Sequence, residues 1–378
     1  IGVRLVGSEM CIRDRIGVKP LPQGYKVSSD LLSKRGELKT KLDMQVELLA
    51  QYEVLKRLGF SLSNSLKSSI SSNIDQIQLA ANSCYDYDSV DPVAGPVWFS
   101  CTQKYNNLKL NDIDQKQLTL KTISVLATDR GSPAIANTYT KPIQVEVRIN
   151  ESQTWQASDD SSAAKTNYLG SGKCDDRCPS NASPWGSLLA IQNNETSTIR
   201  EQVNSYSIQP GQGLSFVANS PLYGFPDHSG QIDISWICLN CDGEDIGLNN
   251  GKGIFTELSV DASSSTGTNF RNRNSATKQF RVTAAGYWSN GKGIIGYTGW
   301  SGAEGQSGTC GEGCFAPSLP VGALIHVKDD GQFVHVKGES NFILDSQQNS
   351  SFRFNDQTGG YDNNEGSLKL LIYCKNCE

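Results

Sequence analysis

Histidine and charged side chains are scarce in this chain of 378 residues, and each scarcity excludes a class of function. There are 3 His, and no base stands paired with a nucleophile, so acid–base catalysis has few candidates and we expect no enzyme. Charged residues make up 19% of the chain and the formal net charge is −5, which gives no support for binding nucleic acid or a membrane surface. No apolar run approaches the roughly 18 residues of a membrane-spanning helix.

Glycine and small polar residues are plentiful instead. The 36 Gly, among many Ser, Asn and Thr, are typical of a turn-rich and mainly β fold, and this length predicts two or three domains. Residues 6–15 read Val-Gly-Ser-Glu-Met-Cys-Ile-Arg-Asp-Arg and resemble the translated read-through of a sequencing adaptor. We therefore set residues 1–15 aside as an artefact, and we expect the natural N-terminus and any signal peptide upstream.

Residues 28 to about 80 carry a helical pattern within an N-terminal region that we place at 16–117. Ser28 or Ser29 offers an N-cap, Gly59 interrupts the pattern, and apolar residues recur at coiled-coil-like spacing, among them Leu31, Leu38, Leu42, Leu49 and Tyr52. Two arrangements remain open: a stalk or oligomerisation helix, and a helical hairpin packed on the rest of the chain. Polar Arg35, Gln45 and Lys56 fall on the same seam and make the heptad imperfect.

The rest of the chain repeats itself with a fixed period. Four cysteines recur 136 positions later, and Asn219 and Gly224 match Asn355 and Gly360 at the same spacing; the cysteines are Cys174, Cys178, Cys238 and Cys241, followed by Cys310, Cys314, Cys374 and Cys377. A fixed period with matching strand ends indicates two copies of one domain. We place them at 118–246 and 251–378, each an antiparallel β-sandwich.

A loop near the C-terminus gathers side chains that carry oxygen atoms. Gly359 and Gly360 permit a sharp turn there, and five oxygen-bearing residues lie within ten positions: Asp356, Asp362, Asn363, Asn364 and Glu365. Oxygen ligands without His or Cys suit Ca²⁺, which takes about 6–8 of them, and argue against zinc or copper in this loop. An ordinary polar hairpin turn is the alternative, because Asn, Asp and Gly also form most turns.

Three segments, in this order, resemble the LecA (PA-IL) galactose-binding lectins. They are Phe-Arg-Val-Thr-Ala-Ala-Gly-Tyr-Trp-Ser at 280–289, Gly-Ala-Leu-Ile-His-Val at 322–327, and Phe-Asn-Asp-(x)2-Gly-x-Tyr-x-Asn-Asn-x-Gly-Ser at 354–367. The resemblance covers about the last third of the chain. It implies a small antiparallel β-sandwich that binds a sugar through a bridging Ca²⁺.

The resemblance also implies a set of site residues. Carried over position by position, the side-chain ligands of Ca²⁺ are Asp356, Asn363 and Asn364, and the carbonyl ligands come from Gly360 and Asn290. The same three side chains contact the sugar, and Trp288 and Trp300, which flank the loop, are the aromatic candidates for packing on its C–H edges. The His-and-Gln sugar loop of the family has no clear counterpart between Trp300 and Cys314, so the sugar stays open.

The first copy departs from this pattern. Ser220, Asp227 and His228 stand where the second copy has Asp356, Asn363 and Asn364. Because ligand charge and number set calcium affinity, we expect the first copy to have lost the ion and to serve as a spacer or packing partner.

Ten cysteines remain once Cys11 is set aside, in five neighbouring pairs. This count favours disulfides in an oxidising, extracellular or surface location, with Cys84 bonded to Cys101. Within each copy the pairs can close locally or cross-link, for example Cys310 with Cys374; chain entropy favours the cross-link, at about 4 against about 2 kcal/mol. A four-thiolate zinc site in each copy is the alternative.

The sequence thus predicts calcium-dependent binding of a galactose-type sugar by a secreted or surface protein, with glycans or glycoproteins as partners. One rival is a structural subunit of a fibre, pilus or appendage, in which homo-oligomer or fibre neighbours are the partners. The other is a secreted hydrolase that these modules target to its substrate.

Overall fold

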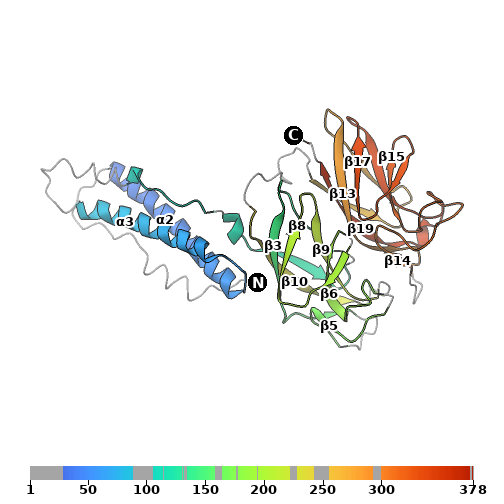
Figure 1. Ribbon diagram of the computed structural model, residues 1–378, viewed down its shortest axis with the longest axis horizontal. Coiled ribbons are helices and arrows are strands. Elements are labelled where there is room, and N and C mark those ends of the chain that lie inside the picture. The colour runs from blue at the N-terminus through green and yellow to red at the C-terminus, as the bar shows by residue number, and fades with distance from the viewer. Residues whose placement is uncertain are drawn as a thin grey trace. The chain divides into compact units, whose positions relative to one another are not determined.

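The computed structural model describes residues 29–87 and 105–377, apart from 114, 130, 132–133, 158–163, 176–177, 194, 222–227, 242–254, 293–298 and 375–376. The chain divides into two compact units, Ile1–Leu120 and Lys121–Glu378. The first unit is helical, as the apolar spacing predicts, and the second consists of antiparallel strands, as the composition predicts (Figure 1). Among the described residues, no helix is long and apolar enough to cross a membrane.

Helices α2 (Ser29–Arg57) and α3 (Asn64–Tyr87) form a hairpin in the first unit (Figure 1). The turn between them contains Gly59, whose φ of 91° favours glycine, and the Ser63 hydroxyl caps α3 by accepting a hydrogen bond from the Leu66 amide at 3.2 Å. The 3₁₀ helix η1 (Gln115–Leu118) lies against α2. The two helices thus pair in a hairpin, while packing of that hairpin on the rest of the chain and a role in oligomerisation both stay predictions. The core of the hairpin is Leu38, Leu42, Tyr52, Leu55, Phe60, Ile70, Ile74 and Ile77.

A buried asparagine explains one of the polar residues on the predicted helical seam. The Asn73 amide nitrogen donates to the Gln45 side-chain oxygen at 3.2 Å and to the Asn111 carbonyl at 3.0 Å. Its Oδ1 accepts from the Asn111 amide at 2.7 Å. Since Asn73 is 0% exposed, these bonds satisfy an otherwise costly buried amide and tie the segment before η1 to the hairpin.

The first copy in the second unit is a sandwich of two antiparallel sheets. One sheet has the order β1-β10-β3-β8, with β4 also paired to β10; its strands are β1 (Lys121–Leu126), β3 (Ile143–Ile149), β4 (Trp155–Gln156), β8 (Val203–Ile208) and β10 (Ser229–Cys238). The other has the order β2-β9-β6-β5, with β7 paired to β6; its strands are β2 (Ile135–Ala136), β5 (Leu169–Ser171), β6 (Trp185–Gln192), β7 (Glu195–Thr198) and β9 (Gly213–Ala218).

The second copy repeats the central strand pairings of the first, but its second sheet has four strands instead of five. Its first sheet has the order β11-β19-β13-β14 with β17 beside β13; the strands are β11 (Phe255–Asp261), β13 (Lys278–Ser289), β14 (Trp300–Ser301), β17 (Glu339–Leu344) and β19 (Glu365–Cys374). Its second sheet has the order β12-β18-β15-β16; the strands are β12 (Thr268–Arg271), β15 (Leu324–Lys328), β16 (Phe333–His335) and β18 (Asn349–Phe354). The 3₁₀ helix η3 (Tyr361–Asn363) lies between β18 and β19.

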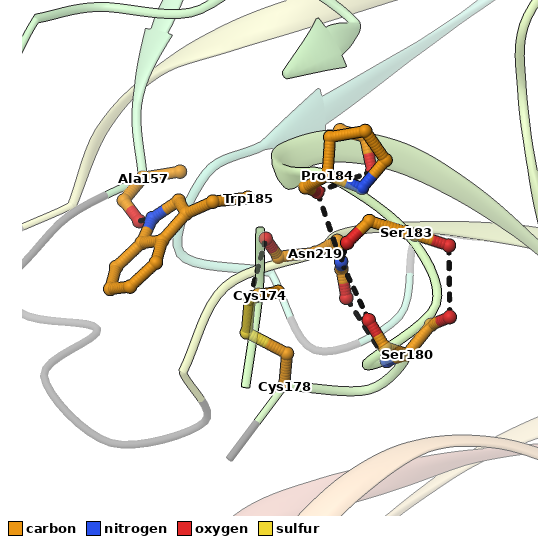
Figure 2. Close-up of a disulfide and its surroundings, with 9 residues drawn as sticks. Ala157, Cys174, Cys178, Ser180, Ser183, Pro184, Trp185 and Asn219 are labelled. Atoms are coloured by element: carbon orange, nitrogen blue, oxygen red, sulfur yellow. Dashed lines mark hydrogen bonds between the residues drawn. A yellow bond between two sulfur atoms is a disulfide. The ribbon is translucent and has the colours of Figure 1, made fainter. Parts of the chain in front are cut away.

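Hydrogen bonds of matched asparagines support the predicted duplication in atomic detail. In the first copy, Asn219 donates to the carbonyls of Ser180, Ser183 and Pro184 at 2.9–3.0 Å (Figure 2). In the second, Asn355 donates to Ala316, Leu319 and Pro320 at 2.8–3.3 Å. Each acceptor lies 136 positions after its counterpart, and both asparagines are 0% exposed. The period seen in the sequence is therefore a period in the fold.

A matched pair of tryptophans anchors the two cores. The indole nitrogens of Trp155 and Trp288 each donate at 2.7 Å to a glycine carbonyl, Gly186 in the first copy and Gly322 in the second. Both glycines have positive φ values, 69° and 72°. The two tryptophans are 133 positions apart because the chain turns at residues 151–152 between β3 and β4, whereas β13 runs without a break.

The eight described cysteines of the two copies form four local disulfides. The bonds are Cys174–Cys178, Cys238–Cys241, Cys310–Cys314 and Cys374–Cys377, with Cα–Cα distances of 5.6–6.1 Å. The preference for cross-linked pairs such as Cys310 with Cys374 is wrong, because the two partners of each local pair already lie within bonding distance across a short turn. The predicted Cys84–Cys101 bond lies outside the described side chains.

The two copies contact each other within the second unit. Leu189, Ile191 and Val217, from β6 and β9, form a buried cluster on which Tyr287 of β13 packs. A polar contact also joins the copies: Arg281 pairs with Glu339 at 2.7 Å, and Arg281 also donates to the Pro210 carbonyl of the first copy at 2.6 Å.

Candidate functional site

Asp356 lies directly after β18, in the loop that leads to η3. It is 6% exposed; its Oδ1 accepts from the Gln357 amide at 2.7 Å, and its carbonyl accepts from the Phe315 amide at 3.1 Å. A Cβ added to Gly360 would lie 3.3 Å from Asp356 Oδ2, so the carboxylate faces the backbone at Gly360. The structure thus brings two of the predicted ligand residues, Asp356 and Gly360, together.

Asn364 ends the same loop, immediately before β19. It is 1% exposed, and its amide nitrogen donates to the Ala262 carbonyl at 3.1 Å. Its Oδ1 is buried and has no hydrogen-bond partner among the described residues. An acceptor in this state costs free energy, about 1–3 kcal/mol, unless something else supplies positive charge or a donor.

The predicted carbonyl ligand at Asn290 lies in the segment that Asn363 contacts. β13 ends at Ser289, which is paired with Glu365 in β19, and the Lys292 amide donates to the Asn363 carbonyl at 2.7 Å. Asn363 itself is exposed, and the Asn290 side-chain oxygen accepts from Gln306 at 2.8 Å. Asn290 and Asn363 therefore belong to adjoining loops at one end of the β13–β19 pair.

The prediction that the Trp288 ring packs on a sugar is wrong, and the same role for Trp300 stays a prediction. Trp288 is 0% exposed and packs edge-on against Phe354 with ring centroids 4.8 Å apart, so its ring belongs to the core and is not available to a sugar. Trp300 is half-buried in β14, where it pairs with Ser289 next to Asn290. Of the two aromatic candidates, only Trp300 borders the candidate site.

Three residues near the loop were not predicted from the sequence. Gln306 donates to Asn290 Oδ1 and to the Gly299 carbonyl. The Phe315 amide donates to the Asp356 carbonyl. Arg353 lies against the rings of both Phe315 and Tyr361. No spacing in the sequence links these segments. The one available signal is the alternation of β18, which points Arg353 away from the core beside buried Phe352 and Phe354.

The corresponding positions of the first copy hold different chemistry. Ser220, the counterpart of Asp356, is 0% exposed, and His228, the counterpart of Asn364, places its Nδ1 at 3.2 Å from the Ala127 carbonyl. In both copies this side chain thus contacts the carbonyl that follows the first strand, Ala127 after β1 and Ala262 after β11. The carboxylate of Asp356 has no counterpart in the first copy. Asp227 lies outside the described residues.

The donor set of the candidate site fits a hard cation better than a zinc ion. Within the described part of the chain, no group of three or more His, Cys, Asp or Glu side chains is placed to hold a metal. The cysteines considered for zinc are joined as disulfides. The oxygen atoms at Asp356, Asn364, Gly360 and Asn290 are of the type that Ca²⁺ accepts.

No family model and no curated protein matches the chain. Among solved structures, it is similar to the EclA N-terminal domain, described as a PllA-like lectin, with 17% identity, a TM-score of 0.25, and coverage of 32% of this chain and 98% of that one. It is also similar to YhaK from Escherichia coli, with 10% identity, a TM-score of 0.18, and coverage of 69% and 89%.

Proposed function

We propose that the second copy binds Ca²⁺ and that the ion coordinates vicinal hydroxyls of a galactose-type sugar. The observation that carries the proposal is the buried Oδ1 of Asn364, which has no hydrogen-bond partner in the part of the chain that the structure describes and lies in the loop that also buries the Asp356 carboxylate. A cation between them would satisfy the amide oxygen and neutralise the carboxylate in one step. The resemblance to LecA-like lectins in this same loop supports the sugar as the ligand of the ion.

Each residue has a distinct part in this proposal. Asp356 supplies the negative charge, buried Asn364 binds the ion, exposed Asn363 binds the ion and sugar hydroxyls, and Gly360 and Asn290 supply carbonyl oxygens. Ca²⁺ tolerates irregular geometry and about 6–8 oxygens, so hydroxyls of the sugar can complete the shell that the protein leaves open. We propose binding without catalysis, because these groups serve as ligands and none is paired with a base.

Glycan-array binding of the full chain tests the proposal. We expect binding to galactose-terminated glycans in calcium, loss of binding with a chelator, and recovery when calcium is returned. Asp356→Ala should abolish binding, whereas Asp362→Ala, at an exposed carboxylate on the same loop, should leave it unchanged. Binding that survives both the chelator and Asp356→Ala would contradict the proposal.

The first copy is proposed as a packing partner, not a second site. Its buried Ser220 replaces the carboxylate, and Leu189, Ile191 and Val217 on its outer face contact the second copy. We also propose an extracellular or surface location, which the four disulfides support because such bonds persist in oxidising compartments.

A structural subunit of a fibre or appendage is the second candidate function. The face-to-face contact between the copies favours it, since sandwiches that stack once could stack repeatedly. The residues of that contact are not repeated, however. Strand register makes Arg353 of the second copy the counterpart of Val217 in the first. It likewise makes Thr154 of the first copy the counterpart of Tyr287 in the second. Filaments of purified chain in electron micrographs would favour this candidate over the lectin.

A further inference from the structure

Arg353 of β18 contacts three separate segments at once. Its guanidinium carbon lies 3.9 Å from the centroid of the Phe315 ring, and its Nη2 donates to the Tyr361 hydroxyl at 3.0 Å. The same nitrogen donates to the Ser265 carbonyl. A planar guanidinium with five donors can stack on a ring and bond in its plane at the same time, which a lysine cannot do.

Each of these three segments is attached to a proposed calcium ligand. The Phe315 amide donates to the Asp356 carbonyl, and the Thr358 amide of the calcium loop donates back to Gly313 at 3.0 Å. Tyr361 opens η3, which ends at Asn363, and its hydroxyl donates to the Phe354 carbonyl at 3.0 Å. The turn that contains Ser265 also contains Ala262, the acceptor of the Asn364 amide.

The first copy serves as an internal comparison. It keeps the local disulfide and the buried asparagine of this region, Cys174–Cys178 and Asn219 (Figure 2), so these features support the fold in both copies. It has Val217 in place of Arg353 and Pro179 in place of Phe315. The arginine contacts therefore occur only in the copy that also carries Asp356 and Asn364.

We propose that Arg353 is a positioning residue of the calcium site: it holds the Phe315 segment, η3 and the Ser265 turn in the arrangement that binds the ion. This inference rests on the proposed function and extends it to a residue that does not touch the ion. By fixing the three segments before calcium arrives, Arg353 reduces the ordering that binding would otherwise require.

The direction in which calcium affinity changes when Arg353 is replaced separates positioning from simple electrostatics. A positive charge close to a cation site weakens cation binding, so removing the charge alone would tighten calcium binding. If positioning dominates, removing the guanidinium weakens binding in spite of the lost repulsion. Arg353→Lys keeps the charge but loses the planar contacts, and Arg353→Gln loses both.

Calorimetric titration of the full chain with calcium chloride, beside thermal melting in chelator, tests the proposal. We expect both Arg353 variants to bind calcium about tenfold more weakly, the scale set by a lost charge-assisted hydrogen bond and a lost cation–π contact. Their calcium-free melting temperatures should stay close to that of the unaltered chain. Phe315→Leu, which removes the ring and keeps the apolar bulk, should weaken binding in the same direction.

Arg271→Lys is the matched control. Arg271 lies on β12 of the same sheet, paired with Asn349 at the far end of β18, and donates to the Gln347 carbonyl. We expect it to leave calcium affinity unchanged. Unchanged or tighter calcium binding in both Arg353 variants would overturn the positioning role alone, whereas no calcium binding by the unaltered chain would overturn the proposed function and this inference with it.

Discussion

Replacing Asn364 by leucine should change stability little without calcium and lower it, relative to the unaltered chain, when calcium is present. The side chain is fully buried, donates one hydrogen bond to Ala262, and has an Oδ1 with no partner among the described residues. Leucine has nearly the same shape and no polar atoms. The substitution removes an unsatisfied acceptor, which stabilises, and leaves the Ala262 carbonyl without its donor, which destabilises.

The expected magnitudes follow from those two terms. Each is worth about 1–3 kcal/mol and they oppose each other, so the calcium-free change in unfolding free energy should not exceed about 2 kcal/mol. At calcium concentrations 100 times the dissociation constant, the unaltered chain gains about 2.7 kcal/mol and the variant gains nothing. The gap between the two proteins should therefore open only when calcium is added.

Asn355→Leu provides the contrast on the same loop. Asn355 is equally buried, but it makes four hydrogen bonds with Ala316, Leu319 and Pro320. At about 1 kcal/mol each, their loss should destabilise the second copy by about 4 kcal/mol with or without calcium. The comparison thus separates an asparagine that serves the fold from one that serves a ligand.

Scanning calorimetry of the full chain, in chelator and in calcium, measures both variants. The Asn355→Leu variant identifies the transition that belongs to the second copy. The reasoning is refuted if Asn364→Leu destabilises the calcium-free protein as much as Asn355→Leu does. It is equally refuted if calcium still raises the melting temperature of the Asn364→Leu variant as much as that of the unaltered chain.

Four further substitutions test other parts of the molecule. His326 is 1% exposed between aromatic rings, and burial lowers its pKa to about 4. The second copy should therefore lose about 3 kcal/mol of stability as pH falls from 6.5 to 4. His326→Phe should remove this loss in a pH series of urea titrations. Asn73→Ala should destabilise the helical unit by about 2–3 kcal/mol, measured by circular dichroism at 222 nm, since it removes three bonds that include two to Asn111. Trp300→Ala should weaken glycan binding about tenfold without lowering the calcium-free melting temperature, whereas Trp288→Ala should unfold the second copy. Full acid sensitivity in His326→Phe, an unchanged melting curve for Asn73→Ala, or unchanged glycan affinity for Trp300→Ala would each refute the argument behind it.

The duplication was accessible from the sequence because it is a matter of spacing. The cysteines and asparagines of the two copies recur at one interval, and the bonds of Asn219 and Asn355 repeat at that interval too. The helical hairpin was accessible for a similar reason, since Gly59 marks the one interruption of the apolar pattern and provides the turn. Local rules determine these features, so a single sequence contains them.

Two errors arose where long-range geometry decides the outcome. The sequence predicts that the Trp288 ring packs on the sugar, but β13 continues to Ser289, and Phe280, Val282, Ala284 and Trp288 share its inward face. The disulfide preference failed differently: chain entropy rewards long loops, but it contains no information on which sulfur atoms lie near each other in the fold.

The surroundings of the candidate site could not be predicted. Asp356 and Asn364 stand out because their residue types cluster within one loop. Phe315 and Ala262 reach that loop from segments about 40 and 100 positions away, through main-chain groups that carry no sequence signal. The contacts of Arg353 depend on which of these segments meet in space, which only the folded chain specifies.

A calcium titration of the full chain by isothermal calorimetry tests the central claim most directly. The account predicts one calcium ion per chain, bound by the second copy, and complete loss of binding in Asp356→Ala with the calcium-free fold preserved. Two equivalent ions per chain, no binding at all, or binding unaffected by Asp356→Ala would contradict it.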